Sequence, residues 1–418
     1  MSQAPHTAAQ PAHVDVPAHS LLSIAVVGAG PLGLALALQA ARALPQARVA
    51  VFDARPPELD ISRDPRTLAL SLGSVQAFER LGVWPAIAAH TTAIRSVHVS
   101  QQQPALLPGR LLRDEPQVFI DAKDLGTLTL GAVVSYGALV APLQAAWMAE
   151  VAREPQRLSA RFGTPVAAVK PISHGVEVDA GIAERYDLAV VAEGGVFSEQ
   201  ARKALAHDYR QTAWVGQIEL ERSLDGVAYE RFTQHGPAAL LPLPAREGPP
   251  RAALVWCVSA DDDPVAELND AQRITVLASI FPQRVGRITG ISPLKCFPLG
   301  LNAERTLVEG RSVRIGNAAQ TLHPVAGQGL NLGLRDAHSL VAALRGLRGG
   351  SIDAALRRVE WQRAPDRWAL IAATDFLARS FTWNLPGFAT LRGLGLAALQ
   401  ALPPARRALA RQMMFGNR

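Results

Sequence analysis

The chain has 418 residues and a mass of 44.5 kDa, which at about 150 residues per domain corresponds to two or three folding units rather than one small module. Hydrophobic residues make up 49% of it and charged residues 19%, a composition that excludes a chain disordered along its whole length. The 42 basic and 36 acidic residues give a net charge of +6, which on its own would allow nucleic acid or an anionic membrane as a partner.

The cysteines and the N-terminus indicate the cellular compartment. Cys257 and Cys296 occur in no metal-ligand spacing, so we expect neither a disulfide framework nor a zinc site, as is typical of the reducing cytosol. Residues 1–20 contain no Lys or Arg and lack the cationic region of a signal peptide, so we expect a disordered tail and a cytoplasmic protein. Leu21 to Ala41 has the length of a membrane span, but its glycines and Pro31 favour a strand, a turn and a helix.

Short β-branched runs and Ala- or Leu-rich runs predict the order of the elements. We expect strands at Ser23–Val27, Arg48–Phe52, Ile94–Ser100, Ala167–Val178, Gln217–Leu220, Ala253–Val258 and Ser312–Ile315, with helices after the first strand to about Leu44 and from about Gly327 to Leu344. The first strand, helix and second strand form a βαβ unit. The strands between about 209 and 259 have no helices of useful length between them and predict an antiparallel sheet. The remaining chain looks helical, with breaks at Pro386 and at Pro403-Pro404.

A dinucleotide-binding motif lies in the βαβ unit. Gly28, Gly30 and Gly33 form a GxGxxG pattern that opens the helix, and Asp53 stands 20 residues after Gly33 at the end of the next strand. The first glycine permits a tight turn, the second lets a pyrophosphate approach the backbone, and the third lets the helix pack close to the strand. The helix N-terminus offers N–H groups to the phosphates, and Asp53 can bind a ribose. A chance glycine turn is the weaker interpretation, but the motif does not choose between NAD and FAD.

A second glycine-rich turn follows the strand at Ser312–Ile315. From Gly316 to Gly329 it reads Gly-Asn-Ala-Ala-Gln-Thr-Leu-His-Pro-Val-Ala-Gly-Gln-Gly. This segment resembles the second flavin motif of the FAD-dependent aromatic hydroxylases, and in particular of the branch that hydroxylates ubiquinone precursors. Further similar stretches extend the resemblance over nearly the whole chain after residue 22: Arg66–Leu70, Leu81–Trp84, Val97–Ser100, Leu130–Val134 and Tyr229–Thr233.

The resemblance implies a fold of the α/β plus β class. It consists of a Rossmann-like FAD-binding domain of the p-hydroxybenzoate hydroxylase type, a substrate domain built on an antiparallel sheet, and a C-terminal helical segment. We expect the FAD-binding domain at 21–82, 106–205 and 295–345, the substrate domain at 83–105 and 206–294, and the helical region at 346–418.

The resemblance also assigns residues to the cofactor, FAD. The middle motif of the family is usually Asp-Gly and is here Glu193-Gly194, while Asn317 replaces a family carboxylate near the ribityl and pyrophosphate region. Neither change is expected to abolish flavin binding, because both side chains still accept hydrogen bonds. The expected FAD-binding residues are Gly28, Gly30, Gly33, Asp53, Arg66, Glu193, Gly194, Gly316, Asn317, Gly327, Gln328, Gly329, Leu330 and Asn331.

The implied reaction converts a polyprenylated phenol, 2-polyprenyl-6-methoxyphenol, to the benzoquinol. NAD(P)H would reduce FAD, and O₂ would form a flavin hydroperoxide that transfers oxygen to the ring. Pro324 and Gly327 would line the oxygen side of the flavin. His323 could be a general base, although positioning the turn is the stronger interpretation because a phenol ring is already activated. The alternatives are hydroxylation at another ring position, a flavin reductase or dehydrogenase, and a non-catalytic subunit of a quinone-synthesis assembly.

Two further groups of polar residues are weaker candidates for functional sites. His98 and Tyr229 could face a substrate cavity, although residues on strands are more often structural. The acidic residues at 261–263 and 267 are expected at a solvated loop and helix start, and we predict no metal site there.

The net positive charge is confined to the C-terminus. Residues 379–418 contain six arginines and no acidic residue, whereas residues 1–378 hold 36 basic and 36 acidic groups. The same segment is rich in Leu, Met and aromatic residues, a mixture that suits the surface of an anionic bilayer. We therefore expect peripheral contact with the inner face of a bacterial cytoplasmic membrane, other ubiquinone-biosynthesis proteins as partners, and no binding of nucleic acid. A helical tail packed on the FAD-binding domain is the alternative.

Overall fold

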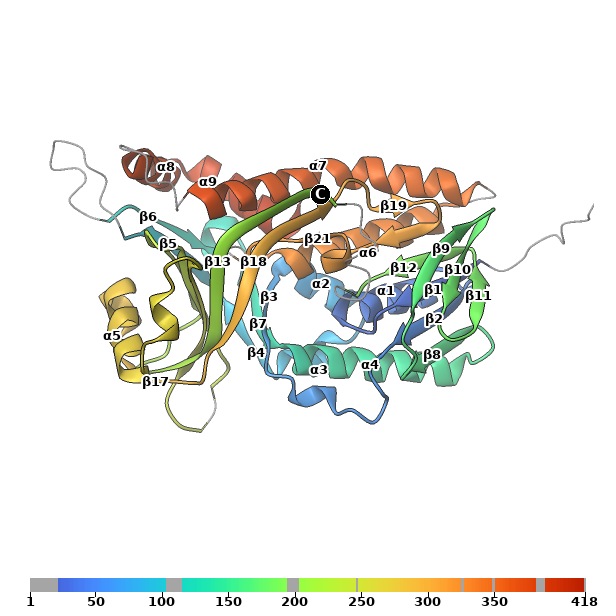
Figure 1. Ribbon diagram of the computed structural model, residues 1–418, viewed down its shortest axis with the longest axis horizontal. Helices are drawn as coiled ribbons and strands as arrows, with labels where there is room; N and C mark the ends of the chain where they lie inside the picture. The colour runs from blue at the N-terminus through green and yellow to red at the C-terminus, as the bar shows by residue number, and fades with distance from the viewer. Residues whose placement is uncertain are drawn as a thin grey trace, which may run out of the picture.

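The computed structural model describes residues 22–102, 115–193, 203–245, 247–324, 327–347, 350–380 and 388–416. Two bodies of sheet and helix lie side by side along the long axis, and a long C-terminal helix runs along one side of both (Figure 1). The expected fold class, α/β plus β with a C-terminal helical segment, is confirmed. The N-terminal tail expected at residues 1–20 and the predicted helix break at Pro386 lie outside the described residues.

The first body is built on a Rossmann-like sheet. Its strands are β1 (Ser23–Val27), β2 (Arg48–Asp53), β8 (Leu158–Phe162), β12 (Leu188–Val191), β19 (Val308–Glu309) and β20 (Ser312–Arg314). They lie in the order β19-β20-β12-β1-β2-β8, and all pairs are parallel except β19 with β20. The central strands are apolar on both faces because both faces are covered, as is usual for parallel sheets.

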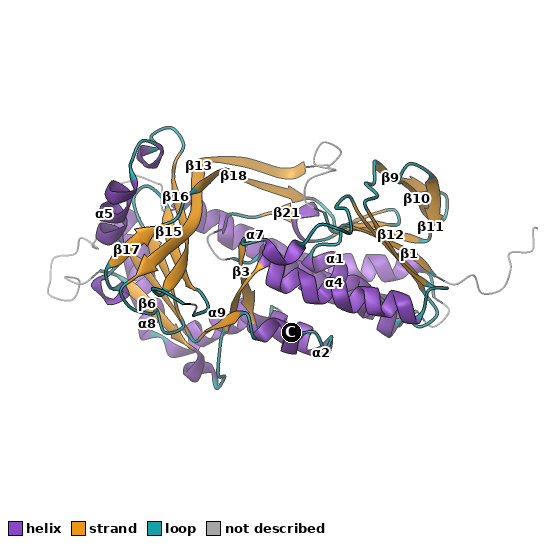
Figure 2. Cartoon of the chain, turned by 90° about the horizontal axis from the view of Figure 1, so that it is seen from below, coloured by secondary structure: helices purple, strands orange, loops and turns teal. Residues whose placement is uncertain are grey.

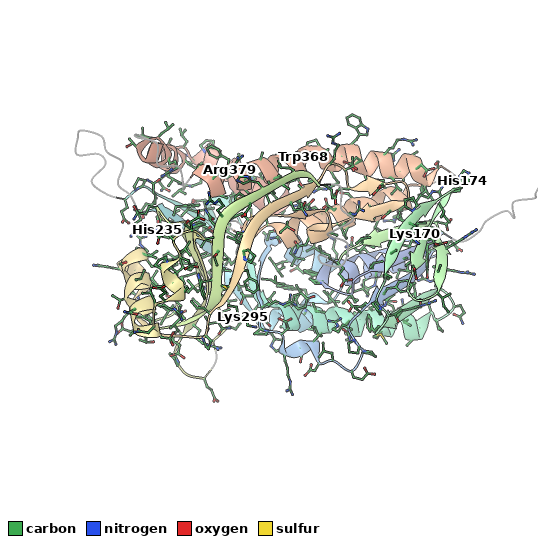
Figure 3. All side chains as sticks on the ribbon, viewed as in Figure 1. Lys170, His174, His235, Lys295, Trp368 and Arg379 are labelled. Carbon is green, nitrogen blue, oxygen red and sulfur yellow. The ribbon has the colours of Figure 1, made fainter. Side chains whose placement is uncertain are left out.

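Helices cover one face of this sheet and a small sheet covers the other. The helices are α1 (Pro31–Ala43), α4 (Tyr136–Arg153) and α6 (Gly329–Arg345), which share the largest hydrophobic cluster with β1 (Figure 2). The small sheet contains β9 (Ala168–Ile172), β10 (Gly175–Asp179) and β11 (Ala183–Tyr186). The single strand predicted at 167–178 is therefore wrong. It is a hairpin that turns at His174, where φ is +60°, at the outer end of this body (Figure 3).

The second body is built on a nine-stranded sheet. Its strands are β5 (Ser96–Gln101), β6 (Gln117–Asp121), β13 (Lys203–Leu220), β14 (Val227–Phe232), β15 (Pro237–Pro242), β16 (Arg251–Ser259), β17 (Ile288–Ile291), β18 (Lys295–Glu304) and β21 (Gln320–Thr321). Eight of them lie in the order β21-β18-β13-β16-β15-β14-β5-β6, and β17 pairs with β13. Among the described strands of this sheet only β14 and β5 pair in parallel, so the antiparallel sheet predicted for this region is confirmed. Helix α5 (Asp270–Ile280) packs on one face.

A third sheet lies between the two bodies. It contains β3 (Thr67–Ser71), β7 (Gly131–Ser135) and β4 (Thr91–Ile94), with α2 (Leu72–Arg80) and α3 (Trp84–Ala88) between its strands in the chain. The strand predicted at 94–100 is thus two strands, β4 and β5, in different sheets. Three strands that we placed in the FAD-binding domain, β6, β18 and β21, belong to the nine-stranded sheet, because their hydrogen-bonded partners β5, β13 and β18 lie there.

The C-terminal region consists of α7 (Ile352–Ser380), α8 (Phe388–Ala401) and α9 (Pro403–Phe415). Buried ion pairs fix it to the first body. Asp366 on α7 contacts Arg335 of α6 and Arg363, which also donates to Asp336 at 2.7 Å. Arg335 donates in addition to the backbone carbonyl of Met413 at 2.7 Å, so α9 is tied to α6. Short 3₁₀ turns occur at Ile61–Arg63, Ala122–Leu125, Pro264–Ala266, Gln283–Val285 and Gly316–Ala318.

Candidate functional site

The first glycine motif forms the turn between β1 and α1. Gly28 has φ of +102°, a conformation that favours glycine, and a Cβ on it would lie 2.9 Å from Cβ of Glu193. A Cβ on Gly33 would lie 1.9 Å from the carbonyl oxygen of Gly28. For Gly30 the nearest atom would be the Tyr136 hydroxyl at 3.3 Å. The fold therefore requires the first and third glycines, whereas the second leaves space beside the backbone for a ligand.

Asp53 joins the end of β2 to this turn. Its carboxylate accepts hydrogen bonds from the backbone N–H of Ala29 at 2.5 Å and of Arg55 at 2.7 Å. The Arg55 guanidinium donates to the carbonyl of Ala29 at 3.3 Å and to Gln144 at 3.0 Å. Burial, and secondly the charge of Asp53, raises the pKa of Glu193, so the two predicted acidic residues face the same turn. Arg55 and Gln144 were not predicted from the sequence, although Arg55 follows Asp53 by two residues.

The two glycine motifs meet at Leu32. A Cβ on Gly316 would lie 2.1 Å from Cδ1 of Leu32, and one on Gly333 would lie 2.5 Å from the same atom. Helices α1 and α6 begin at this contact, and their N-cap residues, Gly30 and Gln328, provide no side-chain cap. Uncapped N–H groups at a helix N-terminus bind phosphates and other anions. The structure thus brings together two such helix ends from opposite ends of the chain.

Asn331 ties the second motif to β3. Its Oδ1 accepts from the backbone N–H of Ser71 at 2.8 Å and from the hydroxyl of Ser74 at 2.7 Å. Its Nδ2 donates to the carbonyls of Ala69 at 3.1 Å and Gly327 at 2.9 Å. These four contacts use the whole buried side chain, so Asn331, expected to bind FAD, acts by holding the Gly327 turn in place.

The other residues of the second motif leave polar groups available. Asn317 is exposed, and its Oδ1 lies 3.5 Å from the position of a Cβ on Gly329. Gln328 is 8% exposed, and its Oε1 has no hydrogen-bond partner among the residues that the structure describes. A buried acceptor without a partner, beside an uncapped helix end, fits a ligand with N–H donors such as a flavin. Pro324 is half-buried, Leu330 packs on the core of the first body, and Gly194 lies outside the described residues.

His323 is buried between this motif and β13. Its Nε2 lies 2.9 Å from Oε1 of Gln211, and its ring meets the ring of Tyr209 edge-on with centroids 5.2 Å apart. Burial lowers the pKa of His323 to about 4, so the ring is neutral at physiological pH. This geometry favours the positioning role over the general-base role. Gln211 and Tyr209 were not predicted because their contact with His323 bridges more than a hundred residues.

Arg66 stands beside the first motif. Its guanidinium forms a 2.7 Å ion pair with Asp64 and lies 4.0 Å from the centroid of the Tyr136 ring, whose hydroxyl neighbours Gly30. A cavity of about 840 Å³ opens between the two bodies at this point. It is lined by Arg63, Asp64 and Thr67 before and in β3, by Ser135 at the end of β7 and Ala138 in α4, by Gln217 and Arg251 of the nine-stranded sheet, and by Leu243 directly after β15.

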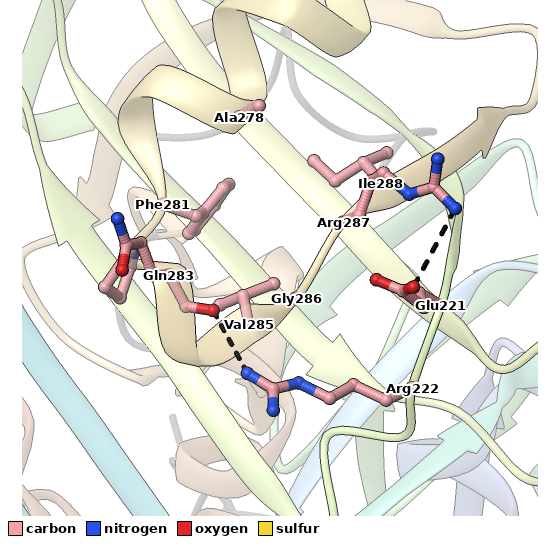
Figure 4. Close-up of a pocket in the computed structure, with 10 residues that line it drawn as sticks. Glu221, Arg222, Ala278, Phe281, Gln283, Val285, Gly286, Arg287 and Ile288 are labelled. Atoms are coloured by element: carbon pink, nitrogen blue, oxygen red, sulfur yellow. Dashed lines mark hydrogen bonds and ion pairs between the residues drawn. The ribbon is translucent and has the colours of Figure 1, made fainter.

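A second cavity, of about 510 Å³, lies beside α5 and contains none of the predicted site residues (Figure 4). Arg222 donates there to the carbonyls of Gln283 and Arg284, and Glu221 lies 3.8 Å from Arg287. The arginines contact other groups of the cavity wall. We therefore do not assign a flavin or phenol site to this cavity.

His98 and Tyr229 lie on the face of the nine-stranded sheet that α5 covers. Their ring centroids are 5.4 Å apart, and His98 Nε2 lies 2.8 Å from Gln117. They therefore face away from the glycine motifs. In the acidic cluster, Asp263 accepts from the indole N–H of Trp214 at 2.9 Å and caps the turn that follows it.

Comparison with known proteins agrees with this geometry. Residues 232–374 match a family model described as an FAD binding domain. The chain is 30% identical over 398 residues to the 3-demethoxyubiquinol 3-hydroxylase of Escherichia coli, covering 90% of this chain and 94% of the relative. It is 38% identical over 212 residues to the ubiquinone hydroxylase UbiL of Rhodospirillum rubrum, covering 49% and 48%.

Solved structures show the same fold at low sequence identity. The p-nitrophenol 4-monooxygenase PnpA of Pseudomonas putida has a TM-score of 0.72 at 16% identity and covers 95% of this chain and 99% of its own. HpxO of Klebsiella pneumoniae, solved with FAD and uric acid, has a TM-score of 0.67 at 17% identity and covers 93% and 97%. The chain therefore belongs to the FAD-dependent monooxygenases, the family that includes the hydroxylases of ubiquinone biosynthesis, and is an enzyme with FAD as its cofactor.

Proposed function

We propose that the protein hydroxylates the aromatic ring of a polyprenylated phenol in ubiquinone biosynthesis, with NAD(P)H as the reductant and O₂ as the oxygen source. The observation that supports this proposal is the contact of Leu32 with Gly316 and Gly333, because it brings together two uncapped helix ends and two glycine turns, as a single flavin site would require. The proposed substrate is 2-polyprenyl-6-methoxyphenol. The name of the Escherichia coli relative supports the alternative of a different ring position in the same pathway.

Bound FAD would supply the chemistry that activates O₂ for transfer to the ring. The residues of this chain supply its binding and orientation. Space beside Gly30 and the N-terminus of α1 would accept the pyrophosphate, and Asp53 would hold the ribose. The N-terminus of α6 would stabilise negative charge on the reduced ring, while Asn331 keeps the Gly327 turn against β3.

Mass spectrometry of the quinone intermediates in cells lacking the protein tests the substrate. Accumulation of 2-polyprenyl-6-methoxyphenol supports the proposed step, and accumulation of a later precursor supports the other ring position. Isotope-labelled O₂ tests the reaction class with the purified enzyme, since a monooxygenase places the label in the product. If NAD(P)H is oxidised but no labelled oxygen is found in the phenol, the enzyme is a reductase instead.

We also propose that the C-terminal helices contact an anionic membrane. No helix among the described residues combines the length and apolarity needed to span a bilayer. Four leucines of this region are nevertheless exposed: Leu391, Leu394, Leu402 and Leu409. Arg407 and Arg411 are also exposed, whereas Arg379, Arg392 and Arg406 contact Asp375, the Ser380 carbonyl and Asp124. Exposed leucines and two exposed arginines on the same C-terminal region suit a peripheral contact with anionic lipid at the cytoplasmic face.

Co-sedimentation with phosphatidylcholine vesicles, with and without phosphatidylglycerol, tests this contact. We expect binding that requires phosphatidylglycerol, falls with salt, and is lost in the double variant R407E/R411E. The variant R357E/R358E on α7 changes the charge equally at exposed arginines outside α8 and α9 and should bind as the wild type does. Equal losses in both variants would point to net charge alone and contradict a local membrane contact.

A further inference from the structure

Glu230 on β14 faces the first body. Alternate residues of a strand point to opposite faces of a sheet. Tyr229 belongs to the cluster formed with α5, whereas Ala228 shares a cluster with Val133 of β7, and Phe232 shares one with Leu377 of α7. Glu230 has the parity of Ala228 and Phe232 and therefore lies on the face that meets β7 and α7. This face also supplies Gln217, Leu243 and Arg251 to the 840 Å³ cavity.

The residues in register with Glu230 form an apolar row across this face. They are Val99 on β5, Ala239 on β15, Val255 on β16 and Val215 on β13. All four, and Glu230 itself, are only partly buried. Their chain neighbours on the opposite face, such as Leu240 and Leu254, are completely buried beneath α5. The row therefore lies on the face that meets β7 and α7, and its side chains stay partly accessible to solvent.

The carboxyl group of Glu230 has no partner within the described part of the protein. Its Oε1 is shielded from solvent and accepts no hydrogen bond, and neither oxygen forms an ion pair with any residue that the structure describes. Burial raises the pKa of Glu230 to about 8, so the group is protonated and neutral near pH 7. Burial, and secondly the charge of Glu230, raises the pKa of the Cys257 thiol on β16, so these two groups lie close together. A buried carboxyl oxygen without a hydrogen-bond partner destabilises the folded protein. A protein retains such a group where a ligand supplies the missing partner.

We propose that Glu230 binds the substrate by exchanging hydrogen bonds with the hydroxyl group of the aromatic ring. This inference rests on the proposed function, because it names the residue that recognises the phenol. A neutral carboxyl donates one hydrogen bond and accepts others, as a phenol hydroxyl does. The apolar row of Val99, Ala239 and Val255 suits the ring and its prenyl chain, and one polar group in an apolar site fixes the orientation of the ligand.

The test compares two ligands that differ only in this hydroxyl, 2-prenylphenol and its methyl ether. Dissociation constants are measured from the change in flavin absorbance of the FAD-loaded wild type and of E230L, E230Q and E219Q. Glu219 is an exposed glutamate of β13 in the same sheet and serves as the matched control. FAD content and far-UV circular dichroism check that each variant folds.

We expect the wild type and E219Q to bind the phenol at least about 10-fold more tightly than the ether, because an unpaired polar group penalises the ether. E230L should bind both ligands within about 3-fold of each other, while the amide of E230Q retains most of the preference. If E230L keeps the full preference, Glu230 is not the recognition group although the enzyme acts on phenols. If the wild type does not distinguish the ligands and does not hydroxylate the phenol, both the inference and the proposed function are wrong.

Discussion

Leu32 packs against Gly316 so closely that a Cβ on the glycine would lie 2.1 Å from Cδ1 of the leucine. Leu32 lies in the first turn of α1, and Gly316 lies in the connection between β20 and α6, with φ of +59°. The two glycine motifs can therefore approach this closely only while residue 316 has no side chain. This contact makes the site sensitive to single methyl groups.

G316A should lower the free energy of unfolding by about 2–4 kcal/mol, the sum of the steric clash and the positive φ. In an L32A background the clash disappears and only the cost of a positive φ at an alanine remains. G316A should then lower the free energy of unfolding by only about 1 kcal/mol. Urea unfolding of the four proteins of this double-mutant cycle measures both values. Additive effects would show that the contact does not couple the motifs.

G30A and G33A should separate the ligand role of the glycine motif from its structural role. G33A places a methyl group against the backbone of Gly28 and should destabilise the fold even without FAD. G30A meets only the Tyr136 hydroxyl at 3.3 Å and should fold, yet bind FAD at least about 10-fold more weakly because its methyl group occupies the phosphate site. Unfolding of the apoprotein and titration with FAD distinguish the two effects. G395A on α8, which has no atom within 4 Å of its new methyl group, is the control.

N331A should destabilise the protein by about 2–4 kcal/mol. It leaves the buried N–H of Ser71 and the carbonyls of Ala69 and Gly327 without their partner. We expect FAD affinity to fall with stability because the turn is no longer held. N331D keeps the shape of the side chain but loses both donated hydrogen bonds. Its stability should therefore lie no higher than midway between those of the wild type and N331A. Unchanged thermal unfolding of N331A would contradict the anchoring role.

His323 should make the protein sensitive to acid. Its pKa is about 4 when folded, below the 6.5 of a histidine in water, so between these values the unfolded chain binds more protons than the native state. Stability from this group is complete above pH 6.5 and is lost as the pH falls towards 4, by at most about 1.4 kcal/mol per pH unit. H323Q should flatten this part of the stability profile, whereas H235Q, at an exposed histidine, should leave it unchanged. Denaturant unfolding at several pH values provides the comparison.

Glu230 should have the opposite pH dependence. Its pKa is raised from 4.5 to about 8, so between these values the native state keeps a proton that the unfolded chain releases. Stability from this group is complete below pH 4.5 and is lost as the pH rises to about 8, by at most about 1.4 kcal/mol per pH unit. E230L should remove this loss and unfold at a higher temperature than the wild type at pH 8. An E230L protein less stable than the wild type at pH 8 would show that the carboxyl has a structural partner.

Local signals predicted the βαβ unit and both glycine turns because their physical requirements are local. Gly28 and Gly33 are needed by the turn itself, and strand and helix periodicities are visible within about ten residues. The pairing of β6 with β5 and of β18 with β13 was not predictable in this way. The residue pattern of a strand does not indicate which other strand it will pair with. The role of Asn331 was assigned to FAD for the same reason: its contacts with Ser71, Ser74 and Ala69 lie in a segment some 260 residues away.

The sequence by itself determined the dinucleotide-binding turn of this protein, since a pyrophosphate needs small residues and an acid at fixed spacings next to a helix end. The resemblance of the second glycine-rich turn to the FAD-dependent aromatic hydroxylases then indicated a flavin. Only the tertiary structure decided which residues of the nine-stranded sheet face the first body. His98, Tyr229 and Glu230 lie on neighbouring strands, yet the first two are covered by α5 and the third lies on the face that meets β7 and α7. Successive side chains of a strand point to alternate faces, and the packing of a helix from elsewhere in the chain determines which of the two faces is covered.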